Sequence, residues 1–295
     1  MIRFMRFKWL YFLISALVIV PGIISLLLFG LKPSIDFTGG TILELRFEKE
    51  LGGEAPQKMM TTLEKSGFEK VQISSSGKNS FLLRLKPITK DEAATVKASL
   101  AQEFDEMPQE LRFETVGPVL GRELLRKTII ATILAALFIL AYIAWSFKET
   151  KFGVCAILAM FHDSLVMLGT FSLFGYFFKV EVDTLFVTAL LTILSFSVHD
   201  TVVVYDRIRE SQRKLPRVSF ADLADKAVTE TLNRSLNNSL TIIFMLLALL
   251  LLGGATTVWF ALALLIGTIS GTYSSAFTAV PLLVVWHQIE EKRGK

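Results

Sequence analysis

This chain of 295 residues has little of what disulfides, metal sites and nucleotide chemistry require. It contains a single cysteine, Cys155, which permits no internal disulfide and suggests no metal cluster. No Gly-x-x-x-x-Gly-Lys segment occurs, so we expect the chain not to hydrolyse ATP. The sequence therefore predicts no cofactor, no metal site and no covalent chemistry, and it favours a protein that is not an enzyme.

Charge is also scarce, since only 20% of the residues are charged and the formal net charge is +4. The positive excess lies in loops and chain ends rather than in one patch, so we expect no nucleic acid as partner. Apolar residues are abundant, with 52% hydrophobic residues and 24 phenylalanines, and the mean hydropathy is +0.53. This composition excludes an ordinary soluble domain and indicates the lipid bilayer as surroundings.

A membrane-spanning helix needs about 20 mostly apolar residues. Six runs come near this length or exceed it: Trp9–Leu31, Ile129–Phe147, Phe152–Phe178, Leu185–Tyr205, Leu236–Leu252 and Thr257–Trp286. The first run is longer than the apolar core of a secretory signal peptide, and no small-x-small cleavage site follows it, so we interpret it as an uncleaved anchor. The sequence predicts an α-helical polytopic membrane protein with six transmembrane helices.

Lysine and arginine in short loops set the orientation of such a protein. They gather at the N-terminus, in the second-to-third loop, in the fourth-to-fifth connection and in the tail, with Lys148, Lys151, Arg207, Arg209, Lys292 and Lys295 among them. The short loops on the opposite side offer only Lys179. We therefore expect both termini in the cytoplasm, in agreement with the even number of spans.

Three regions follow from these spans. Residues 1–31 form a cytoplasmic N-terminus and the first helix, and residues 128–295 form a five-helix domain with a cytoplasmic connection at 206–235 and a C-terminal tail. Between them, residues 32–127 have soluble composition and belong on the exported (periplasmic or extracytoplasmic) side. Their alternating and helical segments follow the order β-α-β-β-α-β, which predicts a small α+β, ferredoxin-like domain. It holds no histidine or cysteine, so a scaffold or docking role is favoured.

Ionisable residues stand inside two of the spans, as His162-Asp163 and His199-Asp200. Asp163 lies about 18 Å beyond Lys151 along a helix, near the bilayer centre, and Asp200 about 9 Å inside Asp206. A charged group at this depth costs roughly 2.5–3.5 kcal/mol on insertion scales and usually marks function. Because neighbours at i and i+1 do not face each other on a helix, we expect each acid to find its partner on another helix.

The fifth span supplies a candidate partner. Arg234, Asn237, Asn238 and Thr241 stand at helical spacing on one face, next to Asn233. A carboxylate that pairs with and separates from a guanidinium would take up and release a proton. We therefore select Asp200 and Arg234 as the proton-transfer pair, with His162, Asp163, His199, Asn233, Asn237, Asn238 and Thr241 as supporting polar residues. For Asn237, Asn238 and Thr241, a purely structural role as interhelical hydrogen-bonding groups is the alternative.

Four motifs in this order resemble the SecD/SecF family of bacterial protein-export subunits, in particular its smaller SecF type. They are Ile35-Asp36-Phe37-Thr38-Gly39-Gly40, then Val116-Gly117-Pro118 with Gly121, then Asp200-Thr201-Val202-Val203-Val204-Tyr205-Asp206-Arg207, and Asn233-Arg234-Ser235 with Asn237. The similarity covers all six spans, and the insert is too small for SecD. His199 stands where the family usually has Asn, and Ser34 where Gly is common.

The resemblance implies an auxiliary subunit of the Sec translocase in the cytoplasmic (inner) membrane. With SecD, such a subunit uses the proton motive force to promote export of preproteins, and Asp200 would carry the proton under the control of Arg234. Implied partners are SecD, the SecYEG channel and the translocating preprotein, with YajC as a further candidate. The wider relationship is to proton-driven RND transporters.

Two other functions stay open at this point. The chain could be an autonomous RND-type, proton-coupled transporter of small molecules or lipids that acts as a homodimer, although a six-span half is short for that task. It could also be a structural assembly factor, in which Asp200 would be replaceable without loss of export rate.

Overall fold

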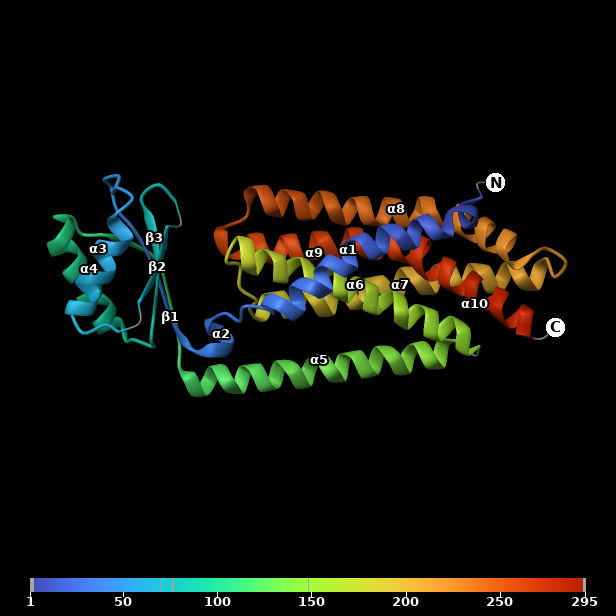
Figure 1. Ribbon diagram of the computed structural model, residues 1–295, viewed down its shortest axis with the longest axis horizontal. Coiled ribbons are helices and arrows are strands. Elements are labelled where there is room, and N and C mark those ends of the chain that lie inside the picture. Colours follow the sequence, from blue (N-terminus) through green and yellow to red (C-terminus); the bar gives the residue numbers. More distant parts are fainter. Residues whose placement is uncertain (1–2, 70, 76, 148, 294–295) are drawn as a thin grey trace. The chain divides into compact units, whose positions relative to one another are not determined.

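The computed structural model describes residues 3–69, 71–75, 77–147 and 149–293 (Figure 1). Lys148 and Lys295 of the charge pattern, and Ser76 of the turn between the two middle strands, lie outside these ranges. The chain divides into two compact units, and each is described by itself: Met1–Lys32 with Ile130–Lys295, and Pro33–Ile129.

The first unit consists mainly of long helices. They are α1 (Lys8–Phe29) after a short 3-10 turn η1 (Phe4–Phe7), α5 (Pro118–Ser146, continuing from the second unit), α6 (Thr150–Phe177), α7 (Thr184–Lys214), α8 (Phe220–Leu252), α9 (Ala255–Ser274), a π-helical turn η2 (Ser275–Ala279) and α10 (Val280–Arg293). Among the described residues, six helical stretches are long and apolar enough to cross a membrane, with α9, η2 and α10 forming the last. The six predicted spans are confirmed.

One helix is longer than the apolar run that predicted it. The fifth apolar run begins at Leu236, but α8 runs without interruption from Phe220 to Leu252. Ser219 caps its start by accepting a hydrogen bond from the backbone N–H of Asp222. No glycine or proline occurs between these ends, so nothing in the sequence breaks the helix.

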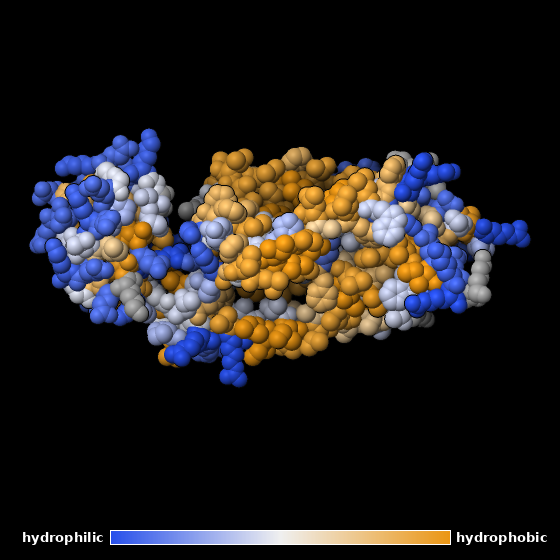
Figure 2. Space-filling view, in the orientation of Figure 1, coloured by the Kyte–Doolittle hydropathy of each residue, from blue (hydrophilic) through white to orange (hydrophobic). Residues whose placement is uncertain are grey.

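The surface of this unit is apolar where a soluble protein would be polar. Large side chains such as Leu17, Phe138 and Leu252 are exposed on α1, α5 and α8. Figure 2 shows the hydrophobic colour around the long helices and the hydrophilic colour at the end that carries the termini. This distribution is typical of a protein whose sides contact lipid hydrocarbon.

Small residues bring the helices of the bundle close together. A Cβ placed on Gly169 of α6 would lie 2.5 Å from the Cα of Gly22 on α1. A Cβ on Gly267 of α9 would lie 2.3 Å from the Ile193 side chain of α7. The first contact is to backbone and the second to a β-branched side chain, so glycine lets α1 approach α6 and α9 approach α7 around the polar groups described below.

The second unit is a small α+β domain, as predicted. Its elements are a short helix α2 (Ile35–Thr38), β1 (Gly40–Arg46), α3 (Ala55–Lys65), β2 (Gln72–Ser75), β3 (Ser80–Leu85), α4 (Lys90–Phe104) and β4 (Gln109–Val116). The antiparallel sheet has the order β2-β3-β1-β4, which is the ferredoxin-like arrangement. Leu43, Leu45 and Leu83 of the sheet are fully buried, together with Met59 of α3 and Val96 of α4.

Gly39 and Gly40 make the turn from α2 into β1. Both have positive φ angles, 75° and 140°, which L side chains rarely adopt. A Cβ on Gly39 would also lie 2.8 Å from the Cα of Pro118, at the start of α5. Backbone conformation and close contact therefore both explain the glycine pair.

Candidate functional site

Asp163 lies in the middle of the helix bundle with no exposed surface. Its Oδ2 accepts hydrogen bonds from Ser197 Oγ of α7 (2.5 Å) and Ser274 Oγ of α9 (2.6 Å), and its Oδ1 accepts one from Ser270 Oγ of α9 (2.6 Å). The fourth contact, also to Oδ1, comes from His162 Nδ1 at 3.0 Å. A carboxylate has about four acceptor positions, so the side chain is fully surrounded by potential donors.

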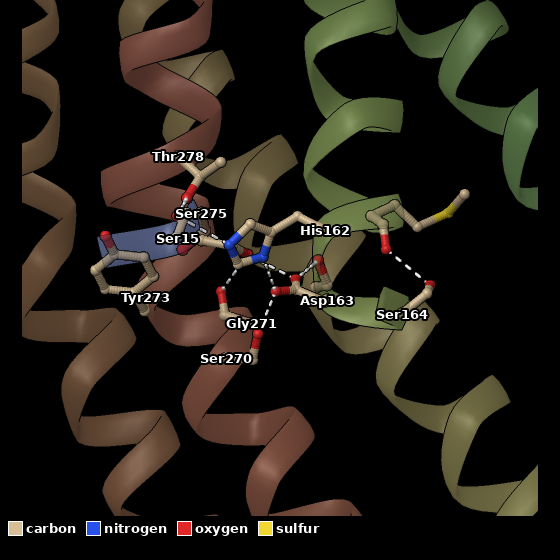
Figure 3. Close-up of polar contacts among 12 residues, drawn as sticks. Ser15, His162, Asp163, Ser164, Ser270, Gly271, Tyr273, Ser275 and Thr278 are labelled. Atoms are coloured by element: carbon tan, nitrogen blue, oxygen red, sulfur yellow. Dashed lines mark hydrogen bonds and ion pairs between the residues drawn. The ribbon is translucent and has the colours of Figure 1, made fainter. Parts of the chain in front are cut away.

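The His162–Asp163 contact contradicts the expectation that sequence neighbours on a helix do not meet (Figure 3). The imidazole is long enough to reach back to the carboxylate beside it, although the two Cβ atoms point in different directions. His162 Nε2 then contacts Ser15 Oγ of α1 at 3.0 Å, and Ser15 contacts Thr278 Oγ1 of η2 at 3.2 Å. The expectation that Asp163 also has partners on other helices is consistent with its three serines.

Asp200 lies in a different environment, on the side of α7 toward α8. It is 6% exposed and accepts one short hydrogen bond, from the hydroxyl of Ser235. Its neighbours enclose a cavity of about 400 Å³, lined by His199, Asp200, Val203, Val204, Thr231, Arg234, Ser235 and Asn238. Among the described residues Asp200 therefore has room to change partners, whereas Asp163 has none.

Arg234 lines the same cavity as Asp200, but within the described part of the chain no ion pair joins them. A second cavity, of about 460 Å³, shares Val203, Thr231 and Arg234 with the first. It is lined further by charged residues of the helix ends, where Arg207 pairs with Glu210 and Glu230. The space beside Asp200 thus continues toward the polar end of α7 and α8.

The remaining predicted residues of α8 and α7 lie on the outside of the unit. Asn233, Arg234, Asn237, Asn238 and Thr241 are exposed, as is His199 beside Asp200. Thr241 donates a hydrogen bond to the carbonyl of Asn237 in its own helix, which needs no partner on another helix. The predicted set therefore separates into a buried group around Asp163 and an outer group around Asp200.

The sequence prediction did not select the serines that contact the two acids and His162: Ser15, Ser197, Ser235, Ser270 and Ser274. Ser270 and Ser274 stand four residues apart within an apolar span, and this spacing indicates one polar helix face. Ser15 and Ser235 carry no such pattern. Only the packing of α1 on α6 and of α8 on α7 brings them to His162 and Asp200.

Six helices that are long and apolar enough to span a membrane, ionisable groups buried between several of them, and a ferredoxin-like domain between the first and second define a multi-pass membrane protein. Comparison with known families shows to which group of membrane proteins the chain belongs. Residues 95–289 match the family described as "Protein export membrane protein SecD/SecF, C-terminal", and residues 24–50 match the "SecD/SecF GG Motif".

Individual relatives agree along almost the whole chain. The protein translocase subunit SecF of Thermobaculum terrenum is 44% identical, over 97% of this chain and 94% of its own. The corresponding subunit of Anaerolinea thermophila is 40% identical, over 98% and 96%. The crystal structure of SecDF from Thermus thermophilus superposes with a TM-score of 0.84 at 34% identity, and covers 97% of this chain but only 39% of that longer one.

The chain therefore belongs to the SecD/SecF family of protein-export membrane proteins, and its similarity is to the SecF subunits within it. It is a multi-pass membrane protein of protein translocation, not an enzyme. The Gly39-Gly40 turn explained above lies within the matched glycine motif.

Proposed function

We propose that the chain uses proton flow to promote preprotein export, and that Asp200 is the group that binds and releases the proton. The observation that carries this proposal is the cavity beside Asp200, which gives a buried carboxylate space, one serine partner and a nearby guanidinium. Moving one charge across the membrane yields about 2.3 kcal/mol per 100 mV, enough to bias a conformational equilibrium.

Arg234 would act as the controlling charge. When it approaches Asp200 it favours the carboxylate, and when it withdraws it favours the protonated acid. The cavity that both side chains line allows this movement without disturbing the packed helices around Asp163. The adjoining charged cavity offers the proton a polar route to one end of the bundle.

The proposed location is the cytoplasmic membrane, with both termini and the α7–α8 connection in the cytoplasm and residues 32–127 on the exported side. The support is the concentration of Lys and Arg at one end of the spans, for example Arg207, Arg209 and Lys214 at the end of α7.

SecD is the proposed direct partner. The exposed amides and the guanidinium on α8 lie beside an apolar span and would be costly against lipid, so a second membrane protein that covers them is favoured. In Thermus thermophilus a SecDF protein of which this chain matches 35% combines the corresponding parts in one polypeptide. SecYEG, the translocating preprotein and YajC are further proposed partners, on the ground of the family alone.

Export by cells that depend on an Asp200→Asn copy tests the proposal, with Glu291→Gln as the control, an exposed acid of α10 that lines neither cavity. We expect slow export of a secreted precursor for Asp200→Asn, at normal membrane abundance and normal co-purification with SecD. Normal export for Asp200→Asn would contradict it and leave the chain a scaffold for its partner. A homodimer that moves a small molecule without SecD would support the alternative transporter function.

A further inference from the structure

A continuous line of polar side chains crosses the bundle from η2 to α7, and the function proposed for Asp200 does not use it. Thr278, Ser15, His162 and Asp163 follow one another at hydrogen-bonding distance, and Ser197 ends the line on α7 (Figure 3). His162 is 7% exposed, and both of its ring nitrogens have a partner. A buried histidine with two partners on opposite sides is suited to hold a proton.

The line keeps all its hydrogen bonds in either protonation state of His162. With two protons, Nδ1–H donates to Asp163, Nε2–H donates to Ser15, and Ser15 donates to Thr278. With one proton, Nδ1–H still donates to Asp163, while Nε2 accepts from Ser15 and Ser15 accepts from Thr278. Only hydroxyl hydrogens rotate, so the proton can come and go without a change in packing.

Few other ionisable groups face this pair from the elements packed around it. On α9 the Tyr273 ring lies 6.4 Å from the His162 ring, and its hydroxyl donates to the Tyr11 carbonyl of α1. The described residues of η2 include no charged side chain, and Lys8 of α1 donates to Gln288. On α7 the nearest acid is Asp200, three residues or about 4.5 Å along the helix from Ser197.

We propose that the His162–Asp163 pair is a second proton-binding site of this chain, and that its protonation depends on the charge of Asp200. The proposal goes beyond the function assigned to Asp200, because it places a second exchangeable proton on α6. A negative charge on Asp200 favours the imidazolium form of His162, and neutral Asp200 disfavours it.

Nitrogen-15 NMR of the histidine rings tests this directly, because the chain has only three histidines. The full chain is labelled with ¹⁵N-histidine in lipid nanodiscs, and His199→Asn and His287→Asn variants assign the signals. Spectra are recorded across a pH series, and we expect His162 to pass from two protonated ring nitrogens to one as the pH rises. In Asp200→Asn, this transition moves toward acid, since the loss of a negative charge disfavours the imidazolium. In Asp206→Asn, which removes an exposed acid of the same helix, it stays in place.

A His162 ring that keeps one protonation state throughout this pH series would overturn the second site. A transition that Asp200→Asn leaves unmoved would overturn its coupling to Asp200. Neither result depends on export, so the proposal for Asp200 itself could still hold; conversely, normal export with Asp200→Asn leaves the NMR result valid.

Discussion

Asp163 and Asp200 are two acids in neighbouring spans of one bundle, but their surroundings differ in the number of hydrogen-bond partners and in the space beside the carboxylate. Asp163 has no exposed surface and four polar contacts from three helices. Asp200 has one hydrogen-bond partner among the described residues, Ser235, and a cavity of about 400 Å³ beside it. The sequence places both directly after a histidine, so sequence context alone would give them the same role.

A buried position within a membrane span therefore does not by itself identify an acid that transfers protons. A carboxylate whose acceptor positions are filled is held in one place and stabilises the packing around it. A carboxylate beside an open space and a movable cation can change its partner. We therefore propose that Asp163 stabilises the packing of the helices and that His162 beside it binds a proton. The proton whose flow promotes export binds to Asp200 in this proposal.

The largest expected effect is a loss of thermal stability when Asp163 is replaced. Asp163→Ala leaves His162 and three serine hydroxyls without their common acceptor, and loss of one member of a buried charged pair costs about 3–5 kcal/mol. Asp200→Ala removes one hydrogen bond beside a cavity and costs about 1 kcal/mol. Thermal unfolding of both variants in detergent measures the difference. Equal losses of stability would remove the distinction between the two acids.

A smaller effect is expected where α1 meets α6. Gly169→Ala forces the Cα of Gly22 away, and overpacking of this kind costs about 1–3 kcal/mol. Because α1 carries Ser15, the same variant should weaken the Ser15–His162 contact and leave the Asp200 cavity unchanged. Gly254→Ala, at a position with nothing within 4 Å and an ordinary φ of −72°, is the control and should unfold at the native temperature.

Substitution of Arg234 tests whether this guanidinium acts on Asp200. Arg234→Gln removes an exposed charge, so we expect unchanged thermal stability but export slower by about tenfold, equivalent to about 1.4 kcal/mol. Arg234→Lys keeps the charge and should retain more of the rate than Arg234→Gln does. A variant that unfolds early, or that exports normally, would show that Arg234 does not act on Asp200.

The smallest effects come from single serines. Ser274→Ala removes one of four contacts to Asp163 and should cost about 1 kcal/mol in thermal stability, without an effect on export. Ser235→Ala removes the only hydrogen-bond donor recorded for Asp200 among the described residues, so we expect little loss of stability and a change in the pH dependence of export. Export that responds to Ser274→Ala and not to Ser235→Ala would reverse the roles assigned here.

Much of the fold could be predicted because its signals are local. Apolar runs near 20 residues indicated the six spans, and alternating and helical segments in the order β-α-β-β-α-β indicated the inserted domain. The early start of α8 was not indicated, because the apolar run begins only at Leu236 and the polar residues before it carry no membrane signal.

The candidate site could be predicted only in part. Ionisable residues in apolar runs are conspicuous, so the acids, the histidines and Arg234 could be selected as candidates, and their role in proton transfer stays a prediction. Serine is common and uncharged, and its partner depends on which helices pack together, so Ser15 and Ser235 could not be found from spacing. The His162–Asp163 contact was wrongly excluded, because the rule on helical neighbours concerns Cβ directions and not the reach of an imidazole.

The most direct test of the account is proton-driven export in inverted membrane vesicles that contain SecD and the Sec channel. The rate of preprotein movement is measured with and without an imposed proton gradient for the native chain, Asp200→Asn and Glu291→Gln, the last at an exposed acid that lines neither cavity. We predict that the gradient accelerates export with the native chain and with Glu291→Gln but not with Asp200→Asn. Acceleration of equal size with Asp200→Asn would contradict the assignment of the working proton to Asp200.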